Sequence, residues 1–488
     1  MAKPRATLGI DLHLEPSGPG LRRGLTEALR EAVRTGRLAP GTRLPSSRSL
    51  AADLGIARNT VAESYADLVA EGWLTARQGS GTRVAMGVPP TPFGQWGRAV
   101  PRPPERTAAY PRVPGRPAYN LIPGTPDLAS FPRAEWLKAT RRALASAPND
   151  ALGYGDPRGR IELRTALAGY LSRARGVRAD PDRIVVCAGF AHGLELLAGV
   201  LHARGLRTLA VESYGLDVHW NIVERAGLRT APLPFDTGGT VVERLGPAGA
   251  GNTPVDDDDG LAGARAVLLT PAHQFPMGVA LLPERRAAVV DWVRSTGGLI
   301  LEDDYDGEFR YDRQSVGALQ DLDPDHVVYL GTASKSLAPG LRLAWMVLPP
   351  SLVTEVTRHG GGRSAGVLEQ LTLAEFLTSG AYDRHVRAAR LRYRRRRDDL
   401  VAALAERAPD VRATGIAAGL HAVLQLPPGT EQSVVRAATW QGVAVHGLSR
   451  YRHPTAPAQP LDALVVGYGT PPDHAWAGTL EALCKALP

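Results

Sequence analysis

The chain has 488 residues, of which 44% are hydrophobic, so it can form two or three domains with sizeable buried cores. No apolar run approaches the roughly 20 residues that span a membrane, and the N-terminus lacks the apolar region of a signal peptide, which favours a cytoplasmic protein without membrane segments. Two cysteines exclude a disulfide scaffold and a cysteine metal cluster, and the net charge of +8 allows binding to nucleic acid without establishing it.

Residues 1–85 carry the pattern of a small helical unit that closes with a hairpin. Apolar residues recur every four positions from Leu21 to Val33, which predicts an amphipathic helix that Gly36 ends. Two short helical patterns follow, with a tight turn between them, and two extended runs then surround a turn at residues 78–81. The helical patterns cover residues 47–55 and 58–72. Three helices and a hairpin predict a winged helix-turn-helix domain.

A winged helix presents one helix to the major groove of DNA, and its wing contacts the backbone or the minor groove. Residues 1–85 contain 12 basic and 8 acidic residues, a net charge of +4. We therefore expect a double-stranded DNA operator as partner, with a helical bundle carrying solvated arginines as the alternative. The expected DNA contacts are Arg58, Asn59 and Thr60 at the start of the groove-facing helix, Arg48 on the preceding helix, and Arg77 and Arg83 on the wing.

Residues 86–118 contain nine prolines and no periodic pattern, which predicts a semi-extended linker. From residue 119 to residue 488, short apolar runs alternate with amphipathic helical patterns. This alternation predicts an α/β domain with a mostly parallel sheet. The predicted strands lie within residues 183–189, 207–213, 265–271, 298–304 and 326–331.

Lys335 stands out because the chain has four lysines among its 57 basic residues. The other three lie at the termini or in a polar stretch, whereas Lys335 follows an apolar strand-like run. An amine among small and hydroxyl residues suits a Schiff base next to a phosphate. Arg342 can pair with phosphate oxygens, and Thr332 and Ser334 can donate hydrogen bonds. A solvated surface lysine is the alternative.

Motifs along the chain carry two family resemblances. The segments PGTRLPS at 40–46, RNTV at 58–61 and GSGT at 79–82 resemble the GntR-type winged helix. From Tyr119 to the C-terminus, the chain resembles the fold-type I aminotransferases, which depend on pyridoxal 5'-phosphate (PLP). TPAHQFPMG at 270–278 and EDDYD at 302–306 resemble the MocR subgroup. In that subgroup a linker joins a GntR-type winged helix to an aminotransferase-like α/β domain.

The resemblance implies roles for individual residues. Lys335 is the expected catalytic residue and would hold PLP as an internal aldimine. Asp303 would pair with the protonated pyridine nitrogen, and Tyr305 would hydrogen-bond the phenolic oxygen. The remaining expected phosphate contacts are Gly189, Phe190 and Ala191 at the start of a helix, together with Tyr154, which would reach the cofactor of the partner subunit. No metal site is expected.

The chain departs from the family patterns at several positions. Ala57 replaces a small hydroxyl residue, which weakens a helix N-cap. Phe275 stands where plain aminotransferases usually have an asparagine before Pro-x-Gly. Leu216 occupies the position of the aromatic residue that stacks on the cofactor. The strand-like run 461–469 lacks the arginine that grips a substrate carboxylate, and the nearest replacements are Arg450 and Arg452.

These features favour a homodimeric, PLP-dependent transcriptional regulator. An amine effector, or the arrival of PLP itself, would change the α/β domain and so alter operator binding. The first alternative is an active aminotransferase with an accessory N-terminal domain. The second is a DNA-binding protein whose larger domain serves for dimerisation alone.

Overall fold

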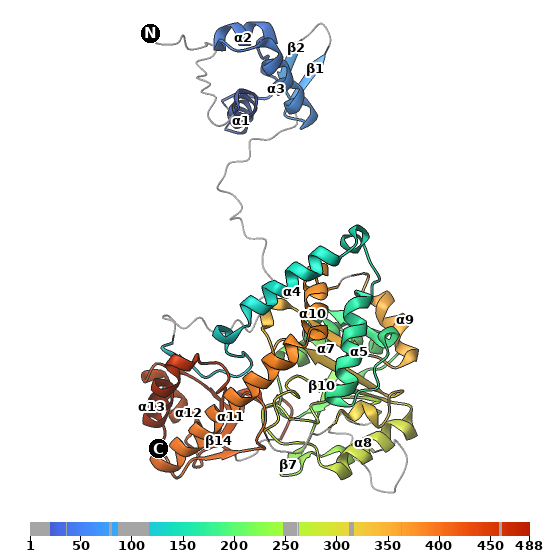
Figure 1. The fold of residues 1–488 in the computed structure, drawn as a ribbon, viewed down its shortest axis with the longest axis vertical. Helices are drawn as coiled ribbons and strands as arrows, with labels where there is room; N and C mark the ends of the chain where they lie inside the picture. The colour runs from blue at the N-terminus through green and yellow to red at the C-terminus, as the bar shows by residue number, and fades with distance from the viewer. Residues whose placement is uncertain are drawn as a thin grey trace. The chain divides into compact units, whose positions relative to one another are not determined.

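The computed structural model describes residues 20–35, 37–77, 81–85, 117–246, 261, 263–311, 317–362, 364–457 and 461–488. The chain divides into two compact units, Met1–Arg112 and Val113–Pro488 (Figure 1). Gly36, the hairpin turn and most of the predicted linker lie outside the described residues, as does the side chain of Arg77. In the described ranges, no helix is both long and apolar enough to cross a bilayer.

The first unit contains three helices and a two-stranded antiparallel hairpin, as the sequence predicts (Figure 1). Leu25, Leu29 and Val33 are buried in its core together with apolar residues from the other elements. Leu21 was expected on the same buried face but is 59% exposed, because it is the first residue of its helix and lies at the edge of the unit. The elements are α1 (Leu21–Arg34), α2 (Ser47–Leu54), α3 (Arg58–Ala70), β1 (Leu74–Arg77) and β2 (Gly81–Val84).

The ends of α2 and α3 follow from their terminal residues. The Ser46 side chain caps α2 by accepting a hydrogen bond from the Ser49 amide at 3.1 Å. Gly55 ends α2 in the left-handed conformation, with φ 65°, which glycine adopts without strain. Ala57 is the N-cap of α3, and its methyl group cannot accept a hydrogen bond. The weaker N-cap predicted at this position is therefore confirmed.

The second unit is built on a seven-stranded sheet in which every predicted strand is present (Figure 1). Adjacent strands are parallel except β12, which is antiparallel to both neighbours, so the mostly parallel sheet is confirmed. The sequence did not predict β6 or β12. In spatial order the strands are β4 (Ile184–Cys187), β12 (Ala344–Val347), β11 (Val327–Thr332), β10 (Leu299–Asp304), β9 (Ala266–Leu269), β5 (Thr208–Glu212) and β6 (Arg229–Leu233).

Helices cover both faces of this sheet because successive strand residues point to opposite sides. Val185 and Cys187 of β4 pack in one apolar cluster with α6, α7 and α9, whereas Ile184 and Val186 pack in another with α5 and α10. A third cluster joins the sheet to α8. The helices are α4 (Arg133–Ser146), α5 (Ile161–Arg175), α6 (Phe190–Ala203), α7 (Asp217–Arg225), α8 (Pro283–Thr296), α9 (Pro350–His359) and α10 (Val367–Thr378). A small hairpin pairs β7 (Phe235–Asp236) with β8 (Gly239–Thr240).

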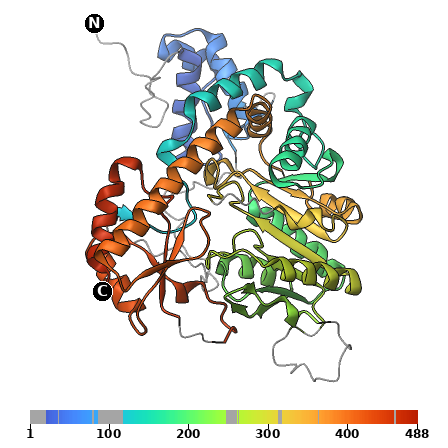
Figure 2. The same ribbon diagram turned by 60° about the horizontal axis from the view of Figure 1, so that its bottom comes forward.

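The C-terminal third of the chain forms a smaller antiparallel sheet with helices packed on it (Figure 2). Its strands, in spatial order, are β13 (Arg412–Thr414), β14 (Ala422–Gln425), β17 (Ala463–Val466) and β16 (His446–Gly447). The helices are α11 (Ala381–Arg407), α12 (Glu431–Trp440) and α13 (Trp476–Ala486). The segment that begins this unit also joins here, since β3 (Tyr119–Asn120) pairs in parallel with β15 (Val443–Ala444).

Candidate functional site

Lys335 and Asp303 lie at the same edge of the seven-stranded sheet. Asp303 lies near the carboxyl end of β10, and Lys335 follows the carboxyl end of the parallel neighbour β11. Ligands of α/β proteins commonly bind at this edge. The Lys335 Nζ donates to the Gly124 carbonyl at 2.6 Å. Burial lowers the pKa of the Lys335 amine, while Asp303 and Asp306 oppose that shift, so the sequence-predicted lysine and carboxylate share one environment.

Asp303 is a buried carboxyl group with an unused hydrogen-bonding atom. Its side chain is 7% exposed, and Oδ1 has no partner among the described residues. Burial raises the pKa of Asp303 well above its usual value, and the nearby Lys335 charge acts in the opposite direction. A buried acceptor without a donor is costly, and a cationic N–H group would remove that cost. The site therefore fits a protonated ring nitrogen at Asp303.

Arg342 lies against Gly189, the N-cap of α6. Gly189 precedes α6 with φ 90°, and a Cβ atom there would lie 3.0 Å from the Arg342 Cζ, so glycine leaves room for the guanidinium. Arg342 itself has φ 53°, a left-handed conformation that non-glycine residues adopt at a cost and mainly where function requires it. A guanidinium beside the amide groups of Phe190 and Ala191 suits a phosphate.

Thr332 and Ser334 bond to each other before the lysine. The Thr332 hydroxyl donates to the Ser334 hydroxyl at 2.8 Å, and the Ser334 amide donates to Thr332 Oγ1 at 3.1 Å. After the lysine, the Ser336 hydroxyl lies 2.8 Å from the Tyr382 hydroxyl, and the Ser336 carbonyl lies 2.7 Å from His385 Nε2. These contacts fix the backbone on both sides of Lys335.

Tyr305 belongs to a buried cluster that the sequence did not reveal. Its hydroxyl lies 3.1 Å from Nδ1 of His273, and the same nitrogen lies 2.9 Å from Oδ2 of Asp306. His421 packs beside His273 with the ring centroids 5.0 Å apart. One potential ligand atom from each of His273, Asp306 and His421 falls within 4.8 Å of the others, a spacing that could also hold a metal ion. Burial and the charges of Asp306 and Asp303 raise the pKa of Tyr305 well above its usual value.

His219 supplies a ring near the lysine that the sequence also did not reveal. The His219 ring packs on Phe190 with a centroid distance of 4.7 Å. Burial lowers its pKa to about 4, and the Lys335 charge contributes in the same direction, so the imidazole is neutral near pH 7. Leu216, at the aromatic position of the family pattern, is the N-cap of α7, and His219 lies in the first turn of that helix.

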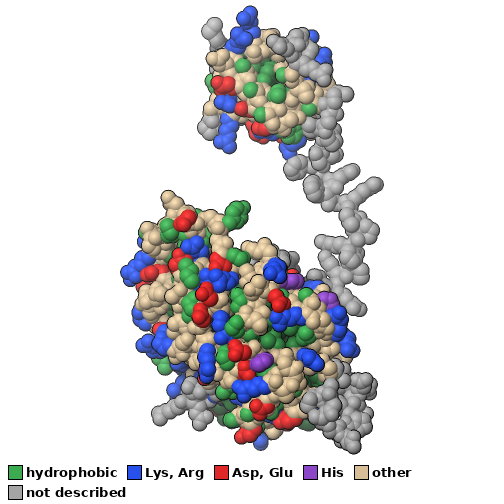
Figure 3. Space-filling view, turned by 90° about the vertical axis from the view of Figure 1, so that its right-hand side faces the viewer, with side chains coloured by type: hydrophobic (Ala, Val, Ile, Leu, Met, Phe, Trp, Pro, Cys, Tyr) green, Lys and Arg blue, Asp and Glu red, His purple; other side chains and the backbone are tan. Residues whose placement is uncertain are grey.

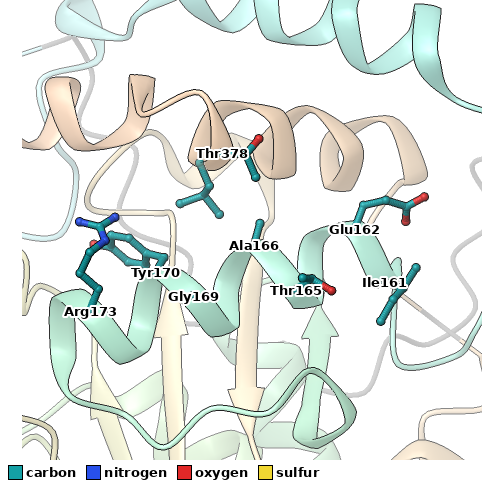
Figure 4. A pocket seen from close by; sticks show the side chains of 9 residues that line it. Ile161, Glu162, Thr165, Ala166, Gly169, Tyr170, Arg173 and Thr378 are labelled. Carbon is teal, nitrogen blue, oxygen red and sulfur yellow. The ribbon is translucent and has the colours of Figure 1, made fainter.

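None of the contacts described above includes Tyr154, Arg450 or Arg452, which the sequence predicted or suggested. The Tyr154 side chain is fully exposed to solvent in the single chain. Arg452 lines a hollow of about 380 Å³ together with Tyr214 and Glu431, and Lys335 does not line it. Arg450 lies in a short 3-10 helix, Leu448–Tyr451, which directly precedes Arg452 in the chain. Lys335 does not line the groove of about 540 Å³ between α5 and α10 either. Figure 4 shows the α5 residues that line this groove, from Ile161 to Arg173.

The first unit presents its predicted DNA contacts on the surface. Arg48, Arg58 and Asn59 are exposed, Thr60 is half-buried, and α3 begins at Arg58 as the sequence predicts. Arg83 is exposed on β2 and donates to the Gly41 carbonyl at 3.0 Å.

Arg43 is a basic residue on the wing that the sequence reading did not single out. It forms an isolated β-bridge with Arg83, and its guanidinium lies against Gly81. The acidic residues Glu63 and Asp67 of α3 form ion pairs with Arg22 of α1.

Charge on the larger unit is mixed in comparison. On the face that Figure 3 shows, Lys and Arg side chains are interspersed with Asp and Glu. A mixed surface has no extended field of one sign, so this face offers no evident track for a nucleic acid backbone.

Comparison with known proteins identifies both units. Residues 21–84 match the family described as bacterial regulatory proteins, gntR family, and residues 120–456 match aminotransferase class I and II. The chain is 33% identical over 481 residues to the HTH-type pyridoxine biosynthesis transcriptional regulator PdxR of Corynebacterium glutamicum, covering 98% of each chain. It is also 33% identical over 463 residues to the probable rhizopine catabolism regulatory protein MocR of Rhizobium meliloti, covering 92% of this chain and 90% of that protein.

Solved structures share the fold of the larger unit. An archaeal alanine:glyoxylate aminotransferase superposes with a TM-score of 0.66 at 24% identity, covering 75% of this chain and 90% of that one. The α-aminoadipate aminotransferase LysN of Thermus thermophilus, solved with N-(5'-phosphopyridoxyl)-L-leucine, gives a TM-score of 0.64 at 23% identity, covering 75% and 91%.

Proposed function

This chain belongs to the GntR family of bacterial regulatory proteins, in the MocR subgroup, and on that premise we propose that it regulates transcription by binding PLP. The relatives PdxR and MocR are named as regulators, and they match this chain over nearly its whole length. The observation that carries the proposal is the electrostatic interaction of the half-buried Lys335 with Asp303, a buried carboxyl group whose Oδ1 has no partner among the described residues.

The residues around Lys335 suit each part of PLP. Lys335 would bind the aldehyde carbon, and Asp303 would accept a hydrogen bond from the ring nitrogen. Arg342 and the amides at the start of α6 would hold the phosphate. PLP, when bound, supplies an aldehyde that reacts reversibly with amines and a ring that withdraws electrons.

His219 would provide the ring that packs on the cofactor, in place of Leu216. The Lys335 charge contributes to the lowered pKa of His219, and Phe190 packs against it from the phosphate-binding end. A neutral imidazole can stack on a pyridine ring without bringing a second positive charge next to the lysine.

The effector would be an amine, or PLP itself. No arginine is present in β17, and Arg452 faces a separate hollow, so no residue here is assigned to a carboxylate of the effector. Exchange of one amine for another at Lys335 would distinguish two states of the larger unit, which is what a regulator requires.

A homodimer completes the proposed site. Tyr154 is fully exposed on one chain, which leaves its hydroxyl available to the phosphate of a second copy. Exposed apolar side chains lie nearby in sequence on α4, on α5 and between them, and such patches commonly mark subunit interfaces. They are Leu137, Leu144, Leu152 and Ile161.

The proposal is tested by measuring DNA binding and cofactor binding on the same full-length protein. A duplex with the promoter region upstream of its own gene serves as the probe. We expect PLP to change the affinity of the natural protein for this duplex, whereas Lys335→Ala should bind the duplex with no response to PLP. Arg58→Ala should lose affinity for the duplex and retain the cofactor absorbance, and binding should weaken steeply as salt rises.

The opposite result would identify the aminotransferase alternative. Rapid amino-group transfer from one amino acid of a panel to the bound PLP, without affinity for the duplex, contradicts the regulatory proposal. A protein that binds the duplex but never acquires the PLP absorbance contradicts the role of the cofactor.

A further inference from the structure

His273, Asp306 and Tyr305 form a buried hydrogen-bonded group at the edge of the sheet. His273 is 3% exposed and Asp306 is 3% exposed. The His273 Nδ1 lies 2.9 Å from Asp306 Oδ2 and 3.1 Å from the Tyr305 hydroxyl. One ring nitrogen therefore contacts both a carboxylate and a phenol, from two segments of chain that are distant in sequence.

The contact with Asp306 decides where the protons are. An ionised carboxylate can only accept a hydrogen bond, so the Nδ1 atom that it contacts carries the proton. The Tyr305 oxygen that approaches the same N–H group is then an acceptor at that contact. Its own hydroxyl proton must be directed elsewhere.

The other nitrogen of His273 supports the same assignment. Within the described part of the chain, Nε2 is buried and has no hydrogen-bond partner. A second proton at Nε2 would be a buried donor without an acceptor, which is unfavourable. The geometry therefore places a proton on Nδ1, where the carboxylate accepts it.

We propose that His273 and Asp306 orient the Tyr305 hydroxyl so that its proton is donated into the site, toward the phenolic oxygen of PLP. This inference rests on the proposed function. Phe275, which precedes Pro276 in the same loop, packs edge-on against the Tyr305 ring at 6.0 Å but has no hydrogen-bonding side chain, so the hydrogen bond from this loop to the Tyr305 hydroxyl comes from His273. His273 and Asp306 are positioning residues, because they act through Tyr305.

The arrangement predicts a change in the titration of the loaded protein. A donor at the phenolic oxygen stabilises negative charge there and lowers the pH at which the cofactor–lysine group loses its proton. Without His273, the Tyr305 hydroxyl could turn toward Asp306, and the donor would be lost. The other titratable groups around this cluster are His421, Asp303, Glu212, Tyr468 and Lys335, and none of them is changed in the variants used for the pH titration.

A metal ion is the competing explanation for this cluster of side chains. His421, the third potential ligand, has its Nε2 3.0 Å from the Pro276 carbonyl. A carbonyl accepts, so that nitrogen carries a proton, and Nδ1 is the atom of His421 that could bind a metal ion. The zinc measurement below therefore decides between the two explanations.

The experiment is a spectrophotometric pH titration of the full-length protein loaded with PLP. His273→Ala should raise the midpoint of the cofactor absorbance change by about one pH unit. In a Tyr305→Phe background, His273→Ala should cause no further shift, because its effect passes through the hydroxyl. His453→Ala, which removes a buried histidine bonded to Thr230, should leave the midpoint unchanged and controls for loss of packing.

Three results would overturn the inference. They are an unchanged midpoint in His273→Ala, an equal shift in the Tyr305→Phe background, and one zinc ion per chain that is retained by the natural protein and lost in His421→Ala. A thermal unfolding curve and the affinity for PLP, measured on each variant, show that the altered protein is folded. Absence of any cofactor absorbance in the natural protein would instead contradict the proposed function, so the two failures are distinguishable.

Discussion

Glu308 shows at the residue scale how the site tolerates buried acidic groups. The Tyr170 and Tyr382 hydroxyls donate to its Oε1 at 3.3 and 3.1 Å, and Tyr382 also bonds Ser336 next to Lys335. Burial, followed by the charge of Asp304, raises the pKa of Glu308 from its ordinary value of 4.5 to about 7. The folded protein therefore keeps a proton that the unfolded chain releases between these two pH values.

The sign of the resulting pH dependence can be checked by one substitution. Because its pKa is raised in the folded state, Glu308 adds to the free energy of unfolding below pH 4.5. This contribution, about 3 kcal/mol, is lost as the pH rises from 4.5 to about 7. Glu308→Gln keeps an acceptor for both phenols and cannot ionise. Urea unfolding of the larger unit should show that the stability of Glu308→Gln relative to the natural protein is higher at pH 8 than at pH 4.5. An identical pH dependence in the two proteins would refute the shift.

His219 carries a second prediction at the residue scale. His219→Ala removes the ring expected to pack on PLP and should weaken PLP binding about tenfold, whereas His219→Phe should retain most of the affinity. Equilibrium titration with PLP, followed by absorbance, gives both values. His446→Ala is the matched control, since that imidazole bonds to Tyr451 rather than to the site. Unaltered affinity in His219→Ala would exclude the stacking role.

Site residues that lie in local motifs could be predicted from the sequence, whereas site residues defined by tertiary contacts could not. Lys335 and Asp303 lie in local motifs. Lys335 follows β11 and Asp303 lies near the end of β10, and an apolar run in the sequence predicts each of these strands. The contact of His273 with Asp306 joins residues that are 33 positions apart, and no local pattern encodes such a contact. His219 was missed for another reason, because the family pattern directs attention to Leu216, one turn earlier.

At the scale of elements, strands were predictable where a run is apolar and long enough. The five predicted strands are all present, and they are buried along their whole length or nearly so. β6 (Arg229–Leu233) starts at an exposed arginine, contains a proline and lies at the sheet edge, which masks the strand pattern. β12 is a four-residue strand, and its antiparallel direction depends on a tertiary neighbour that a local pattern does not specify.

The caps of α2 and α3 make an element-scale prediction. Ala57→Ser should stabilise α3 by about 1 kcal/mol, because a serine at the N-cap accepts a hydrogen bond from the first turn. Ser46→Ala should destabilise α2 by a similar amount, since it removes the bond to the Ser49 amide. Hydrogen exchange of the helix amides in the full-length protein measures both. If the amides of α3 exchange no more slowly in Ala57→Ser than in the natural protein, the capping argument is contradicted.

At the scale of the whole molecule, the proposed dimer can be tested on the exposed face of α4. Ala139 and Ala143 of α4 are buried, whereas Leu137 and Leu144 are 50% and 51% exposed and lie two turns apart on one face. The double variant Leu137→Glu, Leu144→Glu should be monomeric in light scattering, because burying two carboxylates at an interface is costly. Leu391→Glu, on exposed α11, should remain dimeric. A dimeric double variant would place the interface elsewhere.

The hydrogen bond from Lys335 to Gly124 joins the candidate site to the segment that begins the second unit. Gly124 lies a few residues beyond β3, and β3 is the first strand after the predicted linker. The amine that would hold the cofactor is thus also a fastening point for the first residues of this unit. A reaction that left this nitrogen without an N–H group would release the Gly124 carbonyl, so the position of the segment can depend on the state of a single nitrogen atom.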